Sequence, residues 1–255
     1  MKRVLPATLV VCGLALSGRP AHANLLTNGN LDRTHAVEVV PMFFLPKPDA
    51  WSAVGNRAIS GPYNDELSSE PWAGPAPTPV TTDGLLNPPA PAGCSGPDCA
   101  VFFKPFTGNA VDGAMTADLY QDVAATAGLE YQLTGWAGAE ANLDVAGAVF
   151  ALDFFSGGGL LLGSTTLDLL PSLFVVNGEP FNYKQYSLSA VAPFGTATVR
   201  ARVSLIDGVL NPMGGGQAFV VDDFTLDTTQ VPEPATGALT GLAVAYLARV
   251  RRRRR

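Results

Sequence analysis

The 255-residue sequence is poor in the residues that build reactive or zinc-binding sites. It contains three cysteines and two histidines, in no zinc-type spacing, and it has no Gly-x-Ser-x-Gly motif. A structural zinc site needs four such ligands, and a serine or cysteine hydrolase needs a nucleophile beside a base. The sequence therefore offers no zinc site and no nucleophile–base pair, and we predict that the protein is not an enzyme.

Charged residues are also scarce, at 15% of the chain, and the basic ones gather at the two ends. Between residues 24 and 234 only seven basic residues stand against all 22 acidic ones, which gives this part a formal charge of −15. Such a body is repelled by nucleic acid and by anionic membranes. We therefore expect no nucleic-acid partner, and a neutral, hydroxyl-rich or cation-dependent one fits better.

The first 23 residues have the three parts of a secretory signal peptide. Lys2 and Arg3 form a positive start, residues 4–16 form an apolar run, and Ala21-His22-Ala23 supplies small residues for signal peptidase. We predict cleavage after Ala23, and an uncleaved N-terminal anchor is the alternative. Export places the rest of the chain, including Cys94 and Cys99, in an oxidising compartment. The close spacing of these two cysteines in a Gly/Pro-rich turn predicts a disulfide between them.

The last 25 residues, 231–255, have a second address-like pattern. Val231 precedes Pro232, Glu233 and Pro234, and an apolar stretch at 235–248 leads into a terminal arginine cluster that includes Arg251, Arg252 and Arg253. The apolar stretch is just long enough to cross a bilayer when flanking residues are counted, and the arginines favour the cytoplasmic side. A simple membrane anchor is the alternative, and it predicts the same topology.

This tail resembles the PEP-CTERM sorting signal, in which Pro-Glu-Pro, a short hydrophobic helix and an arginine cluster occur in that order. The resemblance implies recognition by exosortase in a Gram-negative, exopolysaccharide-producing bacterium. It also implies an inner-membrane-anchored stage in transit, followed by a place at the cell surface or in the extracellular matrix. Whether the tail is cleaved or retained stays open.

The body, residues 24–230, is predicted to be all-β. Its 27 glycines and 21 prolines across the chain indicate many turns, and no long amphipathic helical pattern occurs. Residues 196–206 alternate, with Val199, Ala201 and Val203 on one face and Arg200 on the other. Six or seven such runs predict an antiparallel β-sandwich. The runs are 116–123, 130–137, 148–155, 160–169, 181–191, 196–206 and 217–227, and Gly157-Gly158-Gly159 marks a hairpin turn between two of them.

The order of these runs resembles jelly-roll domains of the galactose-binding-like and carbohydrate-binding-module type. The matching segments are 24–32, 119–123, 131–136, 192–200 and 219–226. The resemblance implies non-catalytic binding of carbohydrate, here an extracellular polysaccharide. Residues 33–110 depart from it as a long Pro-rich insertion, which the resemblance does not explain.

Three aspartates near the first and last runs are candidate calcium ligands. Asp32 follows the first segment, and Asp222 and Asp223 lie in the last run. The resemblance implies that the two terminal strands lie side by side and often hold a structural Ca²⁺, for which carboxylate oxygens are suitable ligands. The alternative is that these aspartates are strand-end charges facing water.

Aromatic residues of the insertion are candidates for contact with sugar. Trp51, Tyr63 and Trp72 lie among prolines and glycines, where exposed rings would stack on the apolar faces of sugars. The alternative is that they close the edge of the core, and Trp136, inside a strand pattern, is expected in the core itself. Two other functions stay open: a secreted glycan hydrolase that uses a carboxylate pair, and a purely structural matrix protein.

Overall fold

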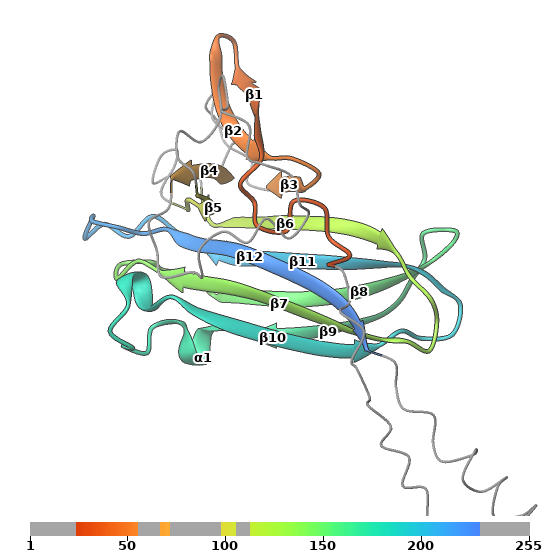
Figure 1. The fold of residues 1–255 in the computed structure, drawn as a ribbon. Helices are drawn as coiled ribbons and strands as arrows, with labels where there is room; N and C mark the ends of the chain where they lie inside the picture. The colour runs from red at the N-terminus through yellow and green to blue at the C-terminus, as the bar shows by residue number, and fades with distance from the viewer. Residues whose placement is uncertain (1–23, 56–66, 72–97, 106–112, 230–255) are drawn as a thin grey trace, which may run out of the picture.

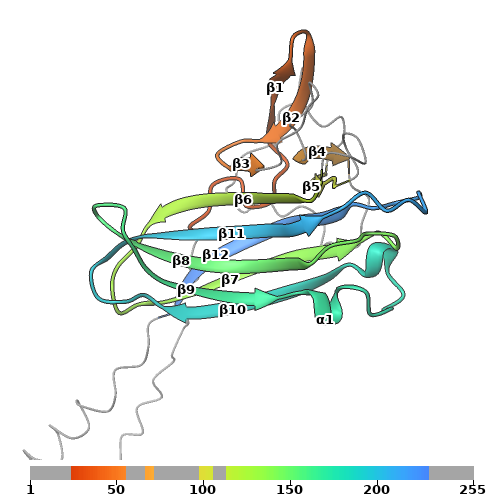
Figure 2. The same ribbon diagram turned by 180° about the vertical axis from the view of Figure 1, so that it is seen from behind.

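The computed structural model describes residues 24–55, 67–71, 98–105 and 113–229. These residues form twelve strands, one short helix and one 3-10 turn (Figures 1 and 2). The first six strands are β1 (Thr34–Val40), β2 (Phe43–Pro48), β3 (Ser52–Gly55), β4 (Leu67–Pro71), β5 (Cys99–Phe103) and β6 (Met115–Ala124). The last six are β7 (Glu130–Ala139), β8 (Gly147–Ser156), β9 (Leu161–Asp168), β10 (Lys184–Val191), β11 (Thr196–Gly208) and β12 (Phe219–Thr229). Helix α1 (Leu170–Leu173) and turn η1 (Pro180–Asn182) lie between β9 and β10.

The strands form two five-stranded antiparallel sheets and a separate hairpin. One sheet has the order β10-β7-β12-β5-β4, and the other has the order β3-β6-β11-β8-β9. Within them, β5-β12-β7-β10 faces β6-β11-β8-β9, which is the strand order of an eight-stranded jelly roll built from two Greek keys. The predicted all-β jelly-roll sandwich is therefore confirmed by the connectivity of the strands.

Alternation along the strands places the core between the two sheets. In β11 the side chains of Val199, Ala201, Val203 and Leu205 are buried, as the alternating sequence predicts. Opposite them, β7 and β12 contribute their own inward residues, among them Leu133 and Leu226. Because successive side chains of a strand point to opposite faces, the remaining positions of β11 form the outer face of its sheet.

The glycine-rich turn joins β8 to β9 as a hairpin. Gly159 has a φ of +79°, a conformation that glycine adopts without steric cost. The Ser156 N–H donates to the Leu160 carbonyl at 2.9 Å, and the Gly159 N–H donates to the Ser156 carbonyl at the same distance. The hairpin predicted from this sequence is therefore confirmed.

Two segments differ from the sequence-based expectation. The strand expected to begin at Phe181 begins at Lys184, because Pro180 starts a 3-10 turn and Phe181 and Asn182 have φ values of +57° and +52°. Trp136, expected in the core, lies half-buried on the outer face of β7. It stacks there on Tyr183, with ring centroids 5.7 Å apart.

The stretch 33–110 contributes strands to both sheets where it is described. β3 extends one sheet by pairing with β6, and β4 and β5 pair with each other and extend the other sheet through β12. The β1–β2 hairpin stands away from the sandwich (Figure 1). Part of this stretch, together with Tyr63, Trp72 and Cys94, lies outside the described residues.

No helix in the described part of the chain is both long and apolar enough to cross a bilayer. The signal peptide expected at 1–23 and the sorting tail expected at 231–255 lie outside that part. Both therefore stay predictions.

Candidate functional site

The first described segment, residues 24–32, lies against the last strand, β12, and this brings the three predicted aspartates into one region. The Leu25 N–H donates to the Leu226 carbonyl at 2.9 Å, and the Phe224 N–H donates to the Gly29 carbonyl at 2.7 Å. Asn24 reinforces this pairing, since its side-chain amide contacts both the Phe224 carbonyl and the Leu226 N–H. These contacts place the loop that carries Asp32 beside the middle of β12.

A fourth aspartate enters through β5. The Cys99 N–H donates to Oδ1 of Asp32 at 2.9 Å, and Asn30 donates to Oδ2 of the same carboxylate at 2.6 Å. Asp98 directly precedes Cys99, so it lies in the same neighbourhood. We call Asp32, Asp98, Asp222 and Asp223 the aspartate cluster.

Charge and burial make the aspartate cluster unfavourable without a counter-ion. Asp222 is fully buried; its Oδ1 accepts the Asp223 N–H at 2.8 Å, and its Oδ2 has no hydrogen-bond partner. Burial, and then the charges of Asp223, Asp98 and Asp32, raise the pKa of Asp222 well above its ordinary value. Burial, followed by Asp98 and Asp32, raises the pKa of Asp223 to about 7. Both shifts have the same physical cause, which is burial together with the like charges of neighbouring aspartates.

The donor chemistry of the aspartate cluster fits a hard cation such as Ca²⁺. Ca²⁺ binds carboxylate oxygens, backbone carbonyls and water, and the buried Oδ2 of Asp222 is an oxygen left without any partner. Among the described residues, no three histidine, cysteine, aspartate or glutamate side chains lie close enough together that they could hold a metal ion between them. Three or more carboxylates of the cluster therefore do not form a ready-made ligand set. Asp32 and Asp222 are buried, and in this they differ from strand-end charges that face water.

The three aromatic candidates do not form an exposed platform in the described structure. Trp51 is only 8% exposed; its Nε1 donates to the Asn28 carbonyl at 2.9 Å, and its ring lies 5.3 Å from that of Phe224. The assignment of Trp51 to sugar binding is therefore corrected, because the ring closes the edge of the core. Tyr63 and Trp72 lie outside the described residues. Cys99 is buried at the start of β5, and the disulfide to Cys94 stays a prediction.

Charged and aromatic side chains lie in a row on the outer face of the β3-β6-β11-β8-β9 sheet. Arg200 on β11 pairs with Asp122 on β6 through two bonds, Nε to Oδ1 at 2.7 Å and Nη2 to Oδ2 at 2.8 Å. The guanidinium carbon lies 3.8 Å from the ring centroid of Tyr120 and 5.1 Å from that of Phe155. Arg200 is thus held by a bidentate ion pair and has two aromatic rings close to its guanidinium group.

Arg202 lies two residues further along β11 and has more polar partners than Arg200. Its Nε donates to Oδ2 of Asp153 at 2.7 Å, and its Nη1 donates to Ser204 at 2.5 Å. Ser164 donates to the same Asp153 carboxylate, and Asp118 lies 3.6 Å from the guanidinium. The two arginines therefore neutralise the acidic side chains of this face.

A cavity of about 280 Å³ opens beside the Arg200–Asp122 pair. This volume lies just below the range of about 300–1,000 Å³ that is typical of ligand pockets. We call this space the β11 cavity. Its lining comes from β6, β8, β11 and the glycine-rich turn, namely Asp122, Phe155, Ser156, Gly157, Gly159, Thr198 and Arg200.

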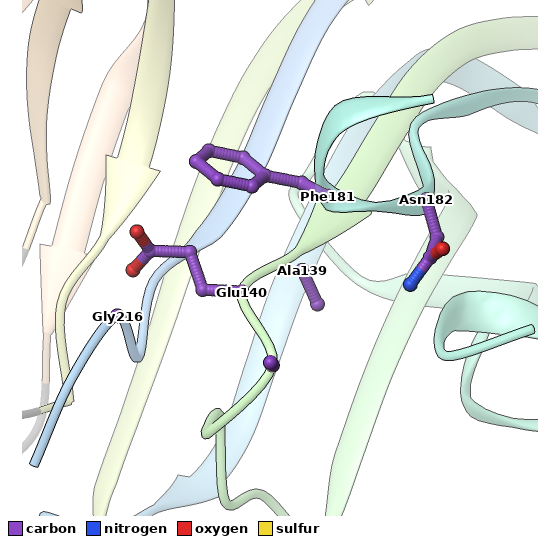
Figure 3. Close-up of a pocket in the computed structure, with 6 residues that line it drawn as sticks. Ala139, Glu140, Phe181, Asn182 and Gly216 are labelled. Atoms are coloured by element: carbon purple, nitrogen blue, oxygen red, sulfur yellow. The ribbon is translucent and has the colours of Figure 1, made fainter. Parts of the chain in front are cut away.

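A second cavity, of about 330 Å³, lies at the opposite end of the sandwich (Figure 3). The ring of Phe181 and the carboxylate of Glu140 extend to one side of it, and Asn182 lies on the other. Oε2 of Glu140 accepts the Ala218 N–H at 2.6 Å, and a side chain at Gly216 would come within 2.4 Å of the same carboxylate. Glu140 therefore holds the neighbouring loop in place. Because its carboxylate is already used in this way, the β11 cavity is the better candidate for a ligand.

Sequence reasoning identified part of this arrangement. It named Asp32, Asp222 and Asp223 and placed Arg200 on the face of its strand opposite the core residues, but it did not select Asp98 or the two cavities. The position of Asp98 immediately before a β-rich run was a usable signal. The β11 cavity gave no such signal, because its lining comes from three separate segments of the chain.

No known protein family matches the sequence, and no curated protein is similar to it at a significant level. Solved structures show a loose likeness in three dimensions. The enzymatically active domain of tailspike protein 4 from bacteriophage CBA120 is 12% identical, with a TM-score of 0.45, over 81% of this chain and 22% of its own. TmCBM61, solved in complex with beta-1,4-galactotriose, is 16% identical, with a TM-score of 0.41, over 81% of this chain and 99% of its own.

The CBM22-1 xylan-binding domain of Xyn10C from Paenibacillus barcinonensis is 10% identical, with a TM-score of 0.35, over 81% of this chain and 99% of its own. Of the solved tailspike chain described above, this chain covers only 22% of the length. Identities and TM-scores this low assign no function to the chain. The assignment of the jelly-roll fold is based on the strand order of the two sheets.

Proposed function

We propose that residues 24–230 form a non-catalytic carbohydrate-binding β-sandwich that the bacterium displays outside the cell. The observation that carries this proposal is the Arg200–Asp122 pair at the β11 cavity, which Phe155 also lines, with the Tyr120 ring centroid 3.8 Å from the Arg200 guanidinium carbon. Sugars present vicinal hydroxyl groups beside apolar ring faces. A carboxylate, a guanidinium and aromatic rings in one place match both features.

The ion pair holds these groups in position before a ligand arrives. The Asp122 side chain is 42% exposed and that of Arg200 is 26% exposed, so both reach solvent while they bind each other. Asp122 accepts hydrogen bonds from sugar hydroxyls, and the remaining N–H groups of Arg200 donate to hydroxyl oxygens. Because the two side chains are already ordered, ligand binding costs less side-chain entropy.

Arg200→Lys should weaken glycan binding about tenfold, because lysine cannot keep the bidentate pair while donating to a ligand. The measurement is a glycan array followed by titration calorimetry with the bound glycan, on residues 24–230. Arg202→Lys is the matched control, since Arg202 lies on the same strand and face but does not line the β11 cavity. Equal weakening by both substitutions would contradict the assignment.

The two alternative functions correspond to other results of the same experiment. The carboxylates of Asp118, Asp122 and Asp153 are held by arginines, which does not favour a free catalytic acid on this face. Turnover of an arrayed glycan, abolished by one aspartate substitution, would nevertheless show a hydrolase. No binding with or without Ca²⁺ would support a purely structural matrix protein.

We further propose that the aspartate cluster holds a structural Ca²⁺. Asp222 would supply its buried Oδ2, with Asp32, Asp98 and Asp223 as the neighbouring carboxylates. The ion would supply positive charge where burial and like charges oppose ionised carboxylates. It would thereby fasten the 24–32 segment and the start of β5 to β12.

The proposal that the chain is exported rests on the order of its terminal sequence patterns. A signal-like start, and a tail that resembles the PEP-CTERM signal, support recognition by signal peptidase and exosortase. In the native host, the protein should be found at the cell surface or in the matrix without residues 1–23. Sequencing of both termini by mass spectrometry checks this, and an intact leader on protein in the cytosol would contradict it.

A further inference from the structure

Four large apolar side chains are exposed at one end of the sandwich. Leu160, Leu161, Val191 and Phe194 are between 51% and 98% exposed, and Phe194 is the most exposed of them. They belong to the β8–β9 turn, the start of β9, the end of β10 and the β10–β11 turn. We call these four residues the end patch.

The two turns that carry the end patch lie against each other. A side chain added at Gly163 would lie 3.2 Å from Pro193 Cγ, and one added at Gly195 would lie 3.7 Å from Leu162 Cδ1. The register agrees, because Thr196 pairs with Ser156 at the end of β8. The end patch is therefore one surface contributed by two adjacent turns.

The chain leaves the sandwich at this same end. Val191 of β10 and Thr229, the last residue of β12, both pair with Glu130 at the start of β7. The turns that follow β6, β8 and β10 accordingly lie where β12 ends (Figures 1 and 2). The segment that continues into Pro232-Glu233-Pro234 thus starts beside the end patch.

The distance to the apolar stretch at 235–248 is limited by the chain itself. Ala235 follows Thr229 by six residues, and an extended chain spans at most 3.3–3.6 Å per residue, or about 20 Å in all. If that stretch enters a bilayer, as the proposed sorting tail requires, the end patch is held within about 20 Å of the lipid surface.

We propose that, while the tail is anchored, the end patch inserts into the surface of the lipid bilayer. The inference rests on the proposed sorting tail and does not depend on sugar binding. The patch residues are apolar and uncharged, whereas residues 24–234 carry a formal charge of −15. Insertion would therefore be driven by apolar burial at neutral headgroups, and anionic lipid would oppose it. The β11 cavity shares the β8–β9 turn with the end patch, so contact with the membrane would place this cavity close to the lipid surface.

The test places a photoreactive benzoylphenylalanine in the full chain, reconstituted into vesicles of phosphatidylcholine. At position 194 irradiation should give covalent lipid adducts that mass spectrometry detects. The matched control is position 213, because Met213 is 85% exposed, against 98% for Phe194, but lies in the β11–β12 connection at the opposite end. At position 213 no lipid adduct should form.

Flotation of the same samples separates the possible failures. A chain that floats with the vesicles but gives no lipid adduct at 194 overturns the inference and leaves the tail proposal standing. A chain that does not float overturns both. An adduct at 194 to a second copy of the protein, without lipid adducts, also overturns the inference and identifies the end patch as a contact between copies.

Discussion

Calcium should raise the melting temperature of residues 24–230 by about 5 to 11 °C at a free concentration 100-fold above its Kd. The estimate follows from about 2.7 kcal/mol of binding linkage and about 2–4 °C per kcal/mol for a domain of this size. Thermal melting in EGTA, in Ca²⁺ and in Mg²⁺ measures the effect. Absence of a shift at millimolar Ca²⁺ would contradict an ion in the aspartate cluster.

Asp222→Asn should separate the ion from the fold. In EGTA the variant should melt at or above the temperature of the unsubstituted protein, because asparagine keeps the shape of Asp222 and replaces a carboxyl group whose ionised form is opposed by burial and by three neighbouring carboxylates. In Ca²⁺ the stabilisation should be lost. Asp227→Asn is the matched control, since Asp227 lies on the same strand outside the cluster, and it should keep the full calcium shift. Loss of the shift in both variants would point to a general charge effect.

Phe224→Ala should lower the free energy of unfolding by about 3–5 kcal/mol. The Phe224 ring lies in the centre of the core, edge to face with Phe150 at 5.3 Å and tilted on Trp51 at the same distance. A side chain at Gly135 on β7 would come within 2.4 Å of this ring, so the surrounding structure is built closely around it. Removal of the ring leaves a cavity that two rigid sheets cannot close.

Urea unfolding in EGTA measures this loss without a contribution from bound calcium. Phe194→Ala is the matched control, because Phe194 is 98% exposed and its truncation should change the free energy of unfolding by no more than about 0.5 kcal/mol. A loss below about 1 kcal/mol for Phe224→Ala would show that the two sheets do not pack as the structure has them.

The aspartate cluster shows how much of a site can be predicted from local sequence. Asp222 and Asp223 stand in a run with strand character, and Asp32 follows the first segment, so a sandwich with adjacent terminal strands predicts that they meet. Asp98 was not predicted, because its place beside Asp32 depends on the neighbouring Cys99 N–H, which donates to the Asp32 carboxylate. The pairing of β5 with β12 that places it there joins segments more than a hundred residues apart.

Trp51 shows the opposite limit. The prolines and glycines around Trp51 in the sequence are compatible with an exposed ring and with a buried one. The decision depends on the Asn28 carbonyl, which accepts the indole N–H, and on Phe224, which lies against the ring. Both partners are far from the local pattern that sequence reasoning evaluates, so the sequence left the two alternatives open.

The sequence by itself determined the β character of the body, the hairpin at Gly157–Gly159 and the two faces of β11, because alternation and glycine turns are local properties. The tertiary structure alone decided that Asp98 joins the cluster, that Trp51 is buried and that Arg200 borders a cavity. It also decided that Phe194 lies where β12 ends. These features depend on which distant strands are neighbours in a sheet, and that choice is made by packing of the whole core.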